Sequence, residues 1–393
     1  MKICDLTQFY SPRSGGVKRY LHEKIAYIER PGSEDEHVLI IPGARTEMIA
    51  GKRSRVYTVR SPLLSRTTQY RALIRLGALD EIIAHERPDL IESSDPYQVG
   101  WRAARIGEQQ RIPALAFYHS HFTQAYLRSP AARLGKRGAA LAMRAAQAYT
   151  RALYDRFDAT LVPSAKLAQV LRSWGVMDTE PMALGVNTEV FRPGNDAVET
   201  RVRLGIPRER TLLLYVGRLA PEKNTRTLFA AFALLAHRCP QKFHLLVIGD
   251  GQERECLRKL ADKTDAVKWL PYCAEAGELA QYYRAADLFV HPGIEETFGL
   301  VALESQACGT PVVGIRGSYM DDVILHAQDA WATENNDRAL SDAMEAMSGL
   351  DLRALGASAS VQAREKYGWP RVFERLFSVY RRVVSDYKGA RSK

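Results

Sequence analysis

The chain has 393 residues, of which 46% are hydrophobic and 25% are charged, and its formal net charge is +10. These proportions are typical of a globular protein with room for two domains, and they exclude the disordered and fibrous classes. Five widely spaced cysteines without a CxxC pair, and the absence of a long apolar run, argue against a metal site, a disulfide framework, a signal peptide and a membrane span. We therefore expect a cytoplasmic protein, with nucleic acid, anionic lipid or phosphorylated ligands as candidate partners.

Short apolar runs alternate with stretches of helical periodicity along nearly the whole chain. This alternation is typical of βαβ units, and it predicts an α/β fold with parallel sheets. The expected strands of the first half are KICDL (2–6), HVLII (37–41), RVYTV (55–59), DLIES (89–93), ALAFYH (114–119) and ATLVP (159–163). Those of the second half are TLLLYVG (211–217), FHLLVIG (243–249), AVKWLP (266–271), DLFVHP (287–292) and TPVVGI (310–315).

A stretch without periodicity separates the two halves. It is rich in Pro, Gly and Asn, and it predicts a linker at 183–196 between an N-terminal domain at 1–182 and a C-terminal domain at 197–369. Open parallel sheets bind ligands at the carboxyl ends of their strands, so the informative residues are those that follow each strand.

Two strand ends of the first half carry candidate residues. Gly15 and Gly16 follow the first strand, and paired glycines let a backbone approach a ligand closely, although an ordinary turn explains them equally well. His119 and His121 follow the fifth strand, where a histidine is more often a packed residue than a catalyst. Their position at a strand end favours a hydrogen bond to a substrate hydroxyl.

Arg218 and Lys223 follow the first strand of the second half, in GRLAPEKN. Two cations at a strand-to-helix junction suit a ligand with two adjacent phosphates, and a solvated basic loop is the alternative. The chain has no GxxxxGK[ST] loop, and GDGQER at 249–254 lacks the third glycine of a dinucleotide fingerprint. ATPase and simple NAD-dehydrogenase functions are therefore disfavoured.

The segment PGIEETFGLVALESQACG (292–309) predicts a buried helix from Gly299 onward, with Glu304 in its middle. A carboxylate among apolar neighbours is costly unless something binds it. Glu296 precedes the same helix by a few residues, so both carboxylates are candidates for ligand contacts.

Taken together, GGVKRYL, YHSHF, LGVNTEVFRP, YVGRLAPEKN, VIGDGQE and PGIEETFGLVALESQACGTPVVG resemble the family 4 glycosyltransferases, in the family's order and over roughly residues 14–314. The resemblance implies a GT-B fold with two Rossmann-like domains that face a central cleft. It also implies that a last helix within 370–393 crosses back to the N-terminal domain. Glu296 and Glu304 match the family's Glu-x7-Glu motif.

The resemblance implies a role for each matching residue. Glu304 would bind the ribose of a nucleotide sugar, which supplies the partner that its apolar helix lacks, and Glu296 would contact the transferred sugar. Arg218 and Lys223 would neutralise the departing diphosphate. The family's other donor-site and catalytic positions correspond to Gly16, His119, Phe298, Gly299 and Leu300, with His121 as the alternative histidine.

The resemblance further implies a retaining hexosyltransferase that uses a UDP- or GDP-sugar as substrate and needs neither a cofactor nor a metal. The expected loop lacks a DxD motif, so the protein itself must supply the cations. After TPVVGI, however, RGSYMDDVILHAQDAWA (316–332) departs from the family's Gly-rich pattern, which leaves the donor sugar open.

The acceptor is expected to be a glycolipid, a lipid-linked sugar or a polysaccharide precursor. YHSHFTQAYL is similar to a segment of family members that glycosylate lipids, and the basic segment 111–151 carries arginines at 137, 144 and 151 near one helix face. That face suits peripheral contact with an anionic membrane, and a solvated face is the alternative. A sugar-nucleotide epimerase, a phosphorylase on the same fold and a non-enzymatic nucleic-acid-binding protein are the rival functions; no nucleic acid is expected, because no recognisable binding motif occurs.

Overall fold

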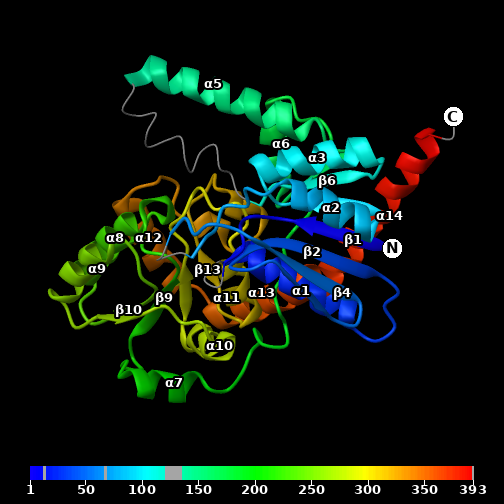
Figure 1. The fold of residues 1–393 in the computed structure, drawn as a ribbon. Helices are drawn as coiled ribbons and strands as arrows, with labels where there is room; N and C mark the ends of the chain where they lie inside the picture. Colours follow the sequence, from blue (N-terminus) through cyan, green and yellow to red (C-terminus); the bar gives the residue numbers. More distant parts are fainter. Residues whose placement is uncertain (12–14, 66–68, 120–134, 392–393) are drawn as a thin grey trace. The chain divides into compact units, whose positions relative to one another are not determined.

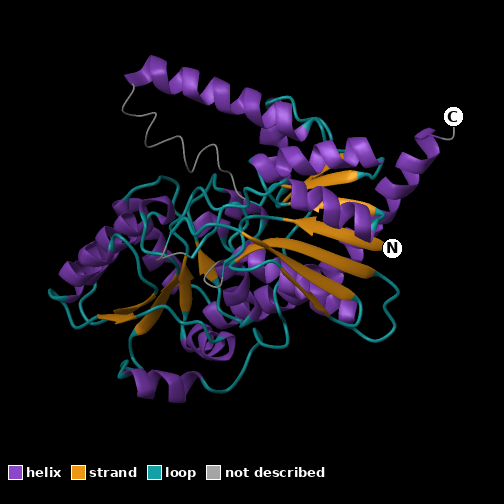
Figure 2. Cartoon of the chain, viewed as in Figure 1, coloured by secondary structure: helices purple, strands orange, loops and turns teal. Residues whose placement is uncertain are grey.

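The computed structural model describes residues 1–11, 15–65, 69–119 and 135–391, and the chain divides into two compact units (Figure 1). The first unit contains Met1–Leu184 and Trp369–Lys393, and the second contains Gly185–Gly368. Each unit has its own sheet, surrounded by helices (Figure 2). Residues 185–196, which the sequence analysis assigned to a linker, are grouped with the second unit.

The first unit is built on an eight-stranded sheet in the order β3-β4-β2-β1-β5-β6-β7-β8. Among the strand pairs of this sheet in the described residues, only β3–β4 is antiparallel. β5, β6 and β7 are buried throughout, as expected for parallel strands covered on both faces. Its elements are β1 (Lys2–Leu6), α1 (Gly16–Glu29), β2 (Glu36–Gly43), β3 (Glu47–Ala50), β4 (Ser54–Arg60), α2 (Gly77–Glu86), β5 (Leu90–Ser93), α3 (Gln98–Gln110), β6 (Ala114–Phe117), α5 (Gly135–Tyr154), β7 (Ala159–Val162), α6 (Ala165–Ser173), β8 (Thr179–Pro181) and α14 (Trp369–Arg391).

The second unit is built on a five-stranded parallel sheet in the order β11-β10-β9-β12-β13. β9 lies at its centre, with β10 on one side and β12 on the other, so the loops that follow these three strands share one edge. Its elements are α7 (Ala197–Leu204), β9 (Thr211–Val216), η1 (Pro221–Lys223), α8 (Thr225–Arg238), β10 (Phe243–Ile248), α9 (Arg254–Ala261), β11 (Val267–Leu270), α10 (Ala276–Ala285), β12 (Leu288–Val290), α11 (Leu300–Ala307), β13 (Val312–Val313), η2 (Tyr319–Asp322), η3 (Gln328–Ala330), α12 (Asp337–Ser348) and α13 (Leu352–Tyr367).

The predicted α/β fold with parallel sheets is confirmed, and each expected strand is present within a few residues of its predicted bounds. β3 and β8 were not predicted. β3 is exposed along its whole length, and β8 has only three residues. Neither therefore shows the buried apolar run by which the other strands were recognised.

A cluster of buried ionisable side chains lies in the core of the first unit. The Nζ of Lys24, on α1, is 3.0 Å from Asp5 Oδ1 and 3.1 Å from Glu92 Oε1, and it donates to the hydroxyl of Tyr380 on α14 at 2.8 Å. His37 also contacts Asp5. Burial raises the pKa of Glu92 to about 7, whereas at Asp5 the neighbouring Lys24 and His37 outweigh burial and lower the pKa. The cluster therefore ties α14 to the sheet of this unit through charge-assisted hydrogen bonds.

α5 extends beyond the rest of the first unit (Figure 1). Its C-terminal part is anchored, because Leu153 is buried and the hydroxyl of Tyr149 donates to the carbonyl of Pro96 at 2.7 Å. Towards its N-terminus Arg137, Leu141 and Arg144 are exposed. In the part of the chain that the structure describes, no helix combines the length and the apolar character needed to cross a bilayer.

The buried cluster predicts a large loss of stability in Lys24→Met, because both carboxylates then lose their shared cation. We expect the free energy of unfolding to fall by about 3–5 kcal/mol at pH 7.5 in urea titrations. Lys52→Met is the matched control, since Lys52 is exposed, and it should change stability by less than about 0.5 kcal/mol. Equal stability of the two variants would contradict the account of the cluster.

Buried histidines of the second unit predict a loss of stability in acid. Burial lowers the pKa values of His291 and His326 to about 4, and the Nε2 of His326 accepts the backbone N–H of Val312 at 2.9 Å. Below about pH 6.5 these histidines are protonated in the unfolded chain but stay neutral in the folded state. The free energy of unfolding is therefore at its full value above that pH. It declines towards pH 4 by up to about 1.4 kcal/mol per pH unit for each group.

Urea unfolding at pH 7.5 and pH 5.0 measures this loss. His326→Gln keeps a hydrogen-bond acceptor but cannot titrate, and it should therefore lose less stability than the wild type between the two pH values. An identical loss in both proteins would show that His326 is not one of the groups responsible.

Candidate active site

The loop that follows β9 carries the two predicted cations. Arg218 is largely exposed and pairs with Glu222 on the same loop, with 2.8 Å between Nη2 and Oε1. Lys223 ends the short helix η1. The two cations thus lie on one loop at the carboxyl edge of the sheet, but each has a carboxylate partner of its own.

Lys223 forms an ion pair with Glu296, which lies on the loop between β12 and α11. Because β9 and β12 are hydrogen-bonded neighbours, the pair joins two loops that follow adjacent strands. Burial alone would raise the pKa of Glu296, but Lys223 lowers it below its ordinary value, with smaller contributions from His291 and Arg218. Glu296 is therefore ionised at neutral pH, as a group that stabilises positive charge must be.

α11 begins directly after the loop that carries Glu296. Gly299 precedes the helix with φ +70°, a conformation that favours glycine, and Leu300 is the first helical residue. The ring of Phe298 is buried, with its centroid 5.9 Å from that of Tyr367. The first amides of a helix have no partner within the helix, and the positive end of its dipole attracts anions. The start of α11 can therefore bind a phosphate group.

Glu304 lies in the middle of α11 and is 2% exposed. Its own helix was expected to offer no partner, and a partner comes from another helix: the hydroxyl of Tyr283, on α10, donates to Glu304 Oε2 at 3.0 Å. One carboxylate oxygen thus has a protein donor, which reduces the cost of burying the group and fixes its orientation.

The loop that follows β10 supports the loop of Arg218 and Lys223. A Cβ on Gly249 would collide with the carbonyl oxygen of Gly217, and a Cβ on Gly251 with that of Leu219. These glycines therefore allow the two loops to pack backbone against backbone. Glu253 is buried at the end of this loop, and the hydroxyl of Thr225 donates to it. GDGQE therefore has a supporting role in the structure rather than that of a dinucleotide fingerprint.

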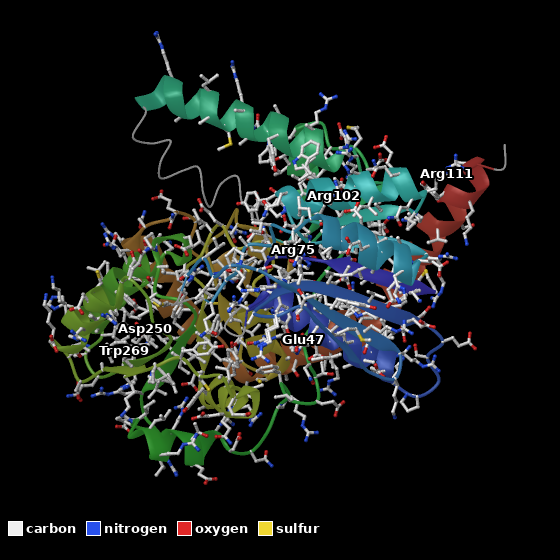
Figure 3. The ribbon with its side chains drawn as sticks, in the orientation of Figure 1. Glu47, Arg75, Arg102, Arg111, Asp250 and Trp269 are labelled. Atoms are coloured by element: carbon white, nitrogen blue, oxygen red, sulfur yellow. The ribbon has the colours of Figure 1, made fainter. Side chains whose placement is uncertain are left out.

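Asp250 follows β10, and Trp269 lies within β11 (Figure 3). The indole Nε1 of Trp269 donates to the carbonyl of Gly249 at 2.8 Å, which connects the two strand ends. Tyr272 follows β11 and is 70% exposed.

The loop that departs from the family pattern packs against the start of α11. Met320, in η2, is fully buried, and its sulfur occupies the space into which a Cβ on Gly299 would point. Arg316 pairs with Asp329 at 2.9 Å across the same loop. Met320 of this segment thus lies directly against Gly299.

Gly16 and His119 belong to the first unit. Gly16 is the first residue of α1, and Tyr20 of the same helix lies with its ring centroid 5.0 Å from that of His119. His119 stacks on Phe117 at 3.9 Å, and burial together with the charge of Lys24 lowers its pKa to about 3. Its imidazole is therefore neutral at physiological pH. His121 lies outside the described residues.

Three residues near the Lys223–Glu296 pair were not selected from the sequence: Asn224, Glu253 and His291. His291 is buried at the end of β12, and its imidazole lies beside Gly293 and Gly299. It stood at the end of an expected strand, which was a usable signal. Asn224 and Glu253 act through partners far away in sequence, which no local pattern reveals. Within the described ranges, no group of three or more His, Cys, Asp or Glu side chains could hold a metal ion.

Comparisons with known proteins agree with this arrangement. Residues 14–190 match the model of "Glycosyltransferase Family 4", and residues 196–353 match that of "Glycosyl transferases group 1". A GDP-mannose-dependent alpha-(1-6)-phosphatidylinositol dimannoside mannosyltransferase of Mycobacterium tuberculosis is 30% identical over 346 residues, which are 88% of this chain and 87% of that relative. A GDP-mannose-dependent alpha-mannosyltransferase of Corynebacterium glutamicum is 29% identical over 82% of this chain and 74% of its own length.

The fold is shared with solved structures of low sequence identity. Sucrose-phosphate synthase from Thermosynechococcus elongatus superposes with a TM-score of 0.76 at 21% identity, over 98% of this chain and 99% of that one. The match of both family models in sequence order, the mycobacterial relative and the shared fold show that the chain belongs to the group 1, family 4 glycosyltransferases, with the GT-B fold.

Proposed function

We propose that this glycosyltransferase moves a hexose, with retention, from a UDP- or GDP-sugar to a hydroxyl of a glycolipid, a lipid-linked sugar or a polysaccharide precursor. The observation that carries the proposal is the Lys223–Glu296 pair beside the start of α11, with Glu304 farther along the same helix. From Gly299 to Glu304 a helix rises by roughly 7–8 Å, which suits the separation of a diphosphate from the ribose of the same nucleotide.

The departing nucleoside diphosphate gains negative charge as its bond to the sugar breaks. Lys223 and Arg218 supply positive charge for it, and the backbone amides of Phe298, Gly299 and Leu300, at the entry to α11, supply hydrogen-bond donors. Cations of the protein thus do the work for which other enzymes use a divalent metal, so we propose a reaction without metal or cofactor.

Glu296 and Glu304 divide the two carboxylate functions. Glu296 is held ionised by Lys223 and would contact the sugar, where positive charge develops at the anomeric carbon. Glu304, oriented by Tyr283, would accept hydrogen bonds from the ribose. In a retaining transfer the acceptor oxygen bonds the anomeric carbon on the face that the diphosphate leaves, and the departing phosphate oxygen can take the acceptor's proton.

We assign acceptor binding to the first unit, in which His119 is the proposed catalytic residue and Gly16 a proposed donor-binding residue. The pKa of His119, lowered to about 3, keeps the imidazole neutral, so it can hydrogen-bond a hydroxyl without adding charge. Two of the relatives act, by their names, on GDP-mannose, and one of them on a phosphatidylinositol dimannoside, which supports a lipid-linked acceptor.

α5 offers a surface for a lipid-bearing acceptor. Arg137, Leu141 and Arg144 recur at helical spacing and are exposed, so this helix can combine electrostatic and apolar contact with an anionic bilayer. We therefore propose peripheral contact at the inner face of the cytoplasmic membrane through the described part of segment 111–151.

Nucleotide binding tests the donor site. Thermal unfolding of the wild type in the presence of UDP, GDP and ADP should show stabilisation by one of them, because a ligand that binds only the folded state raises the midpoint. Glu304→Gln keeps an acceptor for Tyr283 but loses the charge, and the dissociation constant for that nucleotide should rise by about tenfold or more. An unchanged constant would remove Glu304 from the site.

The variant Glu296→Gln distinguishes an effect on sugar transfer from an effect on nucleotide binding. We expect the transfer rate to fall by about a hundredfold or more, since the charge facing the reacting sugar is lost, while the nucleoside diphosphate still binds. Glu295→Gln, on the same loop, is the matched control and should transfer at the wild-type rate. Comparable activity of the two variants would refute the role of Glu296.

Membrane contact is tested with the double variant Arg137→Glu/Arg144→Glu. Partitioning into phosphatidylcholine vesicles with added phosphatidylglycerol should fall by about tenfold or more, because each basic residue near an anionic surface contributes about 1 kcal/mol. Arg353→Glu reverses an exposed charge on α13 and is the control. Equal partitioning of both variants would contradict the assignment of α5.

A further inference from the structure

Asn224 connects the two loops that carry Lys223 and Glu296. Its Nδ2 donates to the carbonyl of Pro292 at 2.9 Å and to the Oδ1 of Asn335 at 2.7 Å, and its Oδ1 accepts from the hydroxyl of Thr227 at 2.7 Å. Pro292 begins the loop that leads from β12 to Glu296. The side chain of Asn224 therefore connects the loop after β9, the loop after β12 and the segment that precedes α12.

The backbone of Asn224 is part of the same arrangement. Asn224 adopts the left-handed conformation, with φ 57° and ψ 32°, where η1 ends and α8 begins. Asparagine tolerates this conformation better than most residues with a side chain. Glycine would tolerate it as well, but without any bond to Pro292. The combination of left-handed backbone and bridging side chain thus calls for asparagine itself.

The bridge lies immediately beside the reacting groups. Asn224 follows Lys223 in sequence, and the carbonyl of Lys223 would lie 3.8 Å from a Cβ on Gly293, so the two loops are close at this point. The ion pair itself is partly exposed, with 28% and 22% of the two side chains accessible. A partly exposed ion pair between flexible side chains does little to hold two loops together. A hydrogen bond from a short side chain to the backbone, in contrast, fixes the separation of the two loops.

We propose that Asn224 is a positioning residue for transfer, which holds the loops after β9 and β12 at the separation that places Lys223 beside Glu296. This inference rests on the proposed function. It concerns how the site is aligned rather than what it binds, because the side-chain bonds of Asn224 reach Pro292 and Asn335 and neither Glu304 nor the start of α11. Loss of the bridge should therefore reduce turnover more than nucleotide affinity.

The test is a double-mutant cycle between Asn224→Gly and Lys223→Ala. Asn224→Gly keeps the left-handed backbone and removes only the side-chain bonds. We expect it to lower kcat by roughly tenfold to a hundredfold, as small misplacements of catalytic groups do, with the dissociation constant of the nucleoside diphosphate within about threefold of the wild type. Because Asn224 acts through Lys223, adding it to Lys223→Ala should cost less than about twofold more.

Gln241→Gly is the matched control. Gln241 also has a left-handed backbone, with φ 61°, but it lies in the exposed loop before β10, at the opposite edge of the sheet. Its replacement should leave kcat unchanged. The inference is overturned if Asn224→Gly keeps wild-type kcat, if its effect adds fully to that of Lys223→Ala, or if nucleotide affinity falls as much as kcat.

Hydrogen exchange gives a readout that is independent of activity. In Asn224→Gly, amides of both loops, 218–227 and 291–299, should exchange several-fold faster, whereas loosening of the first loop alone would overturn the bridge. If the wild type transfers no sugar from any nucleotide, the proposed function is refuted. Hydrogen exchange then decides whether Asn224 bridges the two loops. An active wild type with an indifferent Asn224→Gly would refute only this inference.

Discussion

The ion pair between Lys223 and Glu296 is the interaction on which the proposed donor site of the second unit depends. It exists because β9 and β12 are neighbours in a parallel sheet, so the loops after them meet at one edge. The lysine keeps the partly buried carboxylate ionised, and the carboxylate in turn neutralises the lysine. In the proposed reaction both groups interact with the substrate: the cation with the diphosphate, and the carboxylate with the sugar.

Much of the fold could be predicted from the sequence, because parallel strands buried on both faces leave continuous apolar runs such as those of β9 and β10. The exceptions have physical causes. β3 is an exposed edge strand that pairs only with β4, and β8 ends in Pro181, so neither needs an apolar run. The burial of Lys24 could not be foreseen either, since its partners come from β1, β5 and α14.

For the proposed donor site, the sequence indicated the charged residues but not the residues that support them. Position after a strand identified Lys223, position just before the helix identified Glu296, and the apolar surroundings of Glu304 identified a carboxylate that needs a partner. The partner that the protein supplies, Tyr283, lies on another helix, and the bridge from Asn224 reaches Pro292 and Asn335. Such contacts depend on how elements pack, which local sequence patterns do not encode.

The most direct test of the central claim is the release of nucleoside diphosphate from nucleotide sugars, followed by phosphorus NMR in the wild type and in Lys223→Ala. The account predicts that the wild type releases the diphosphate from donors of one nucleotide family. It also predicts that release in Lys223→Ala is slower by about a hundredfold or more, because the cation facing the leaving group is gone. Release at the same rate in both proteins would contradict the claim that the donor site depends on this ion pair.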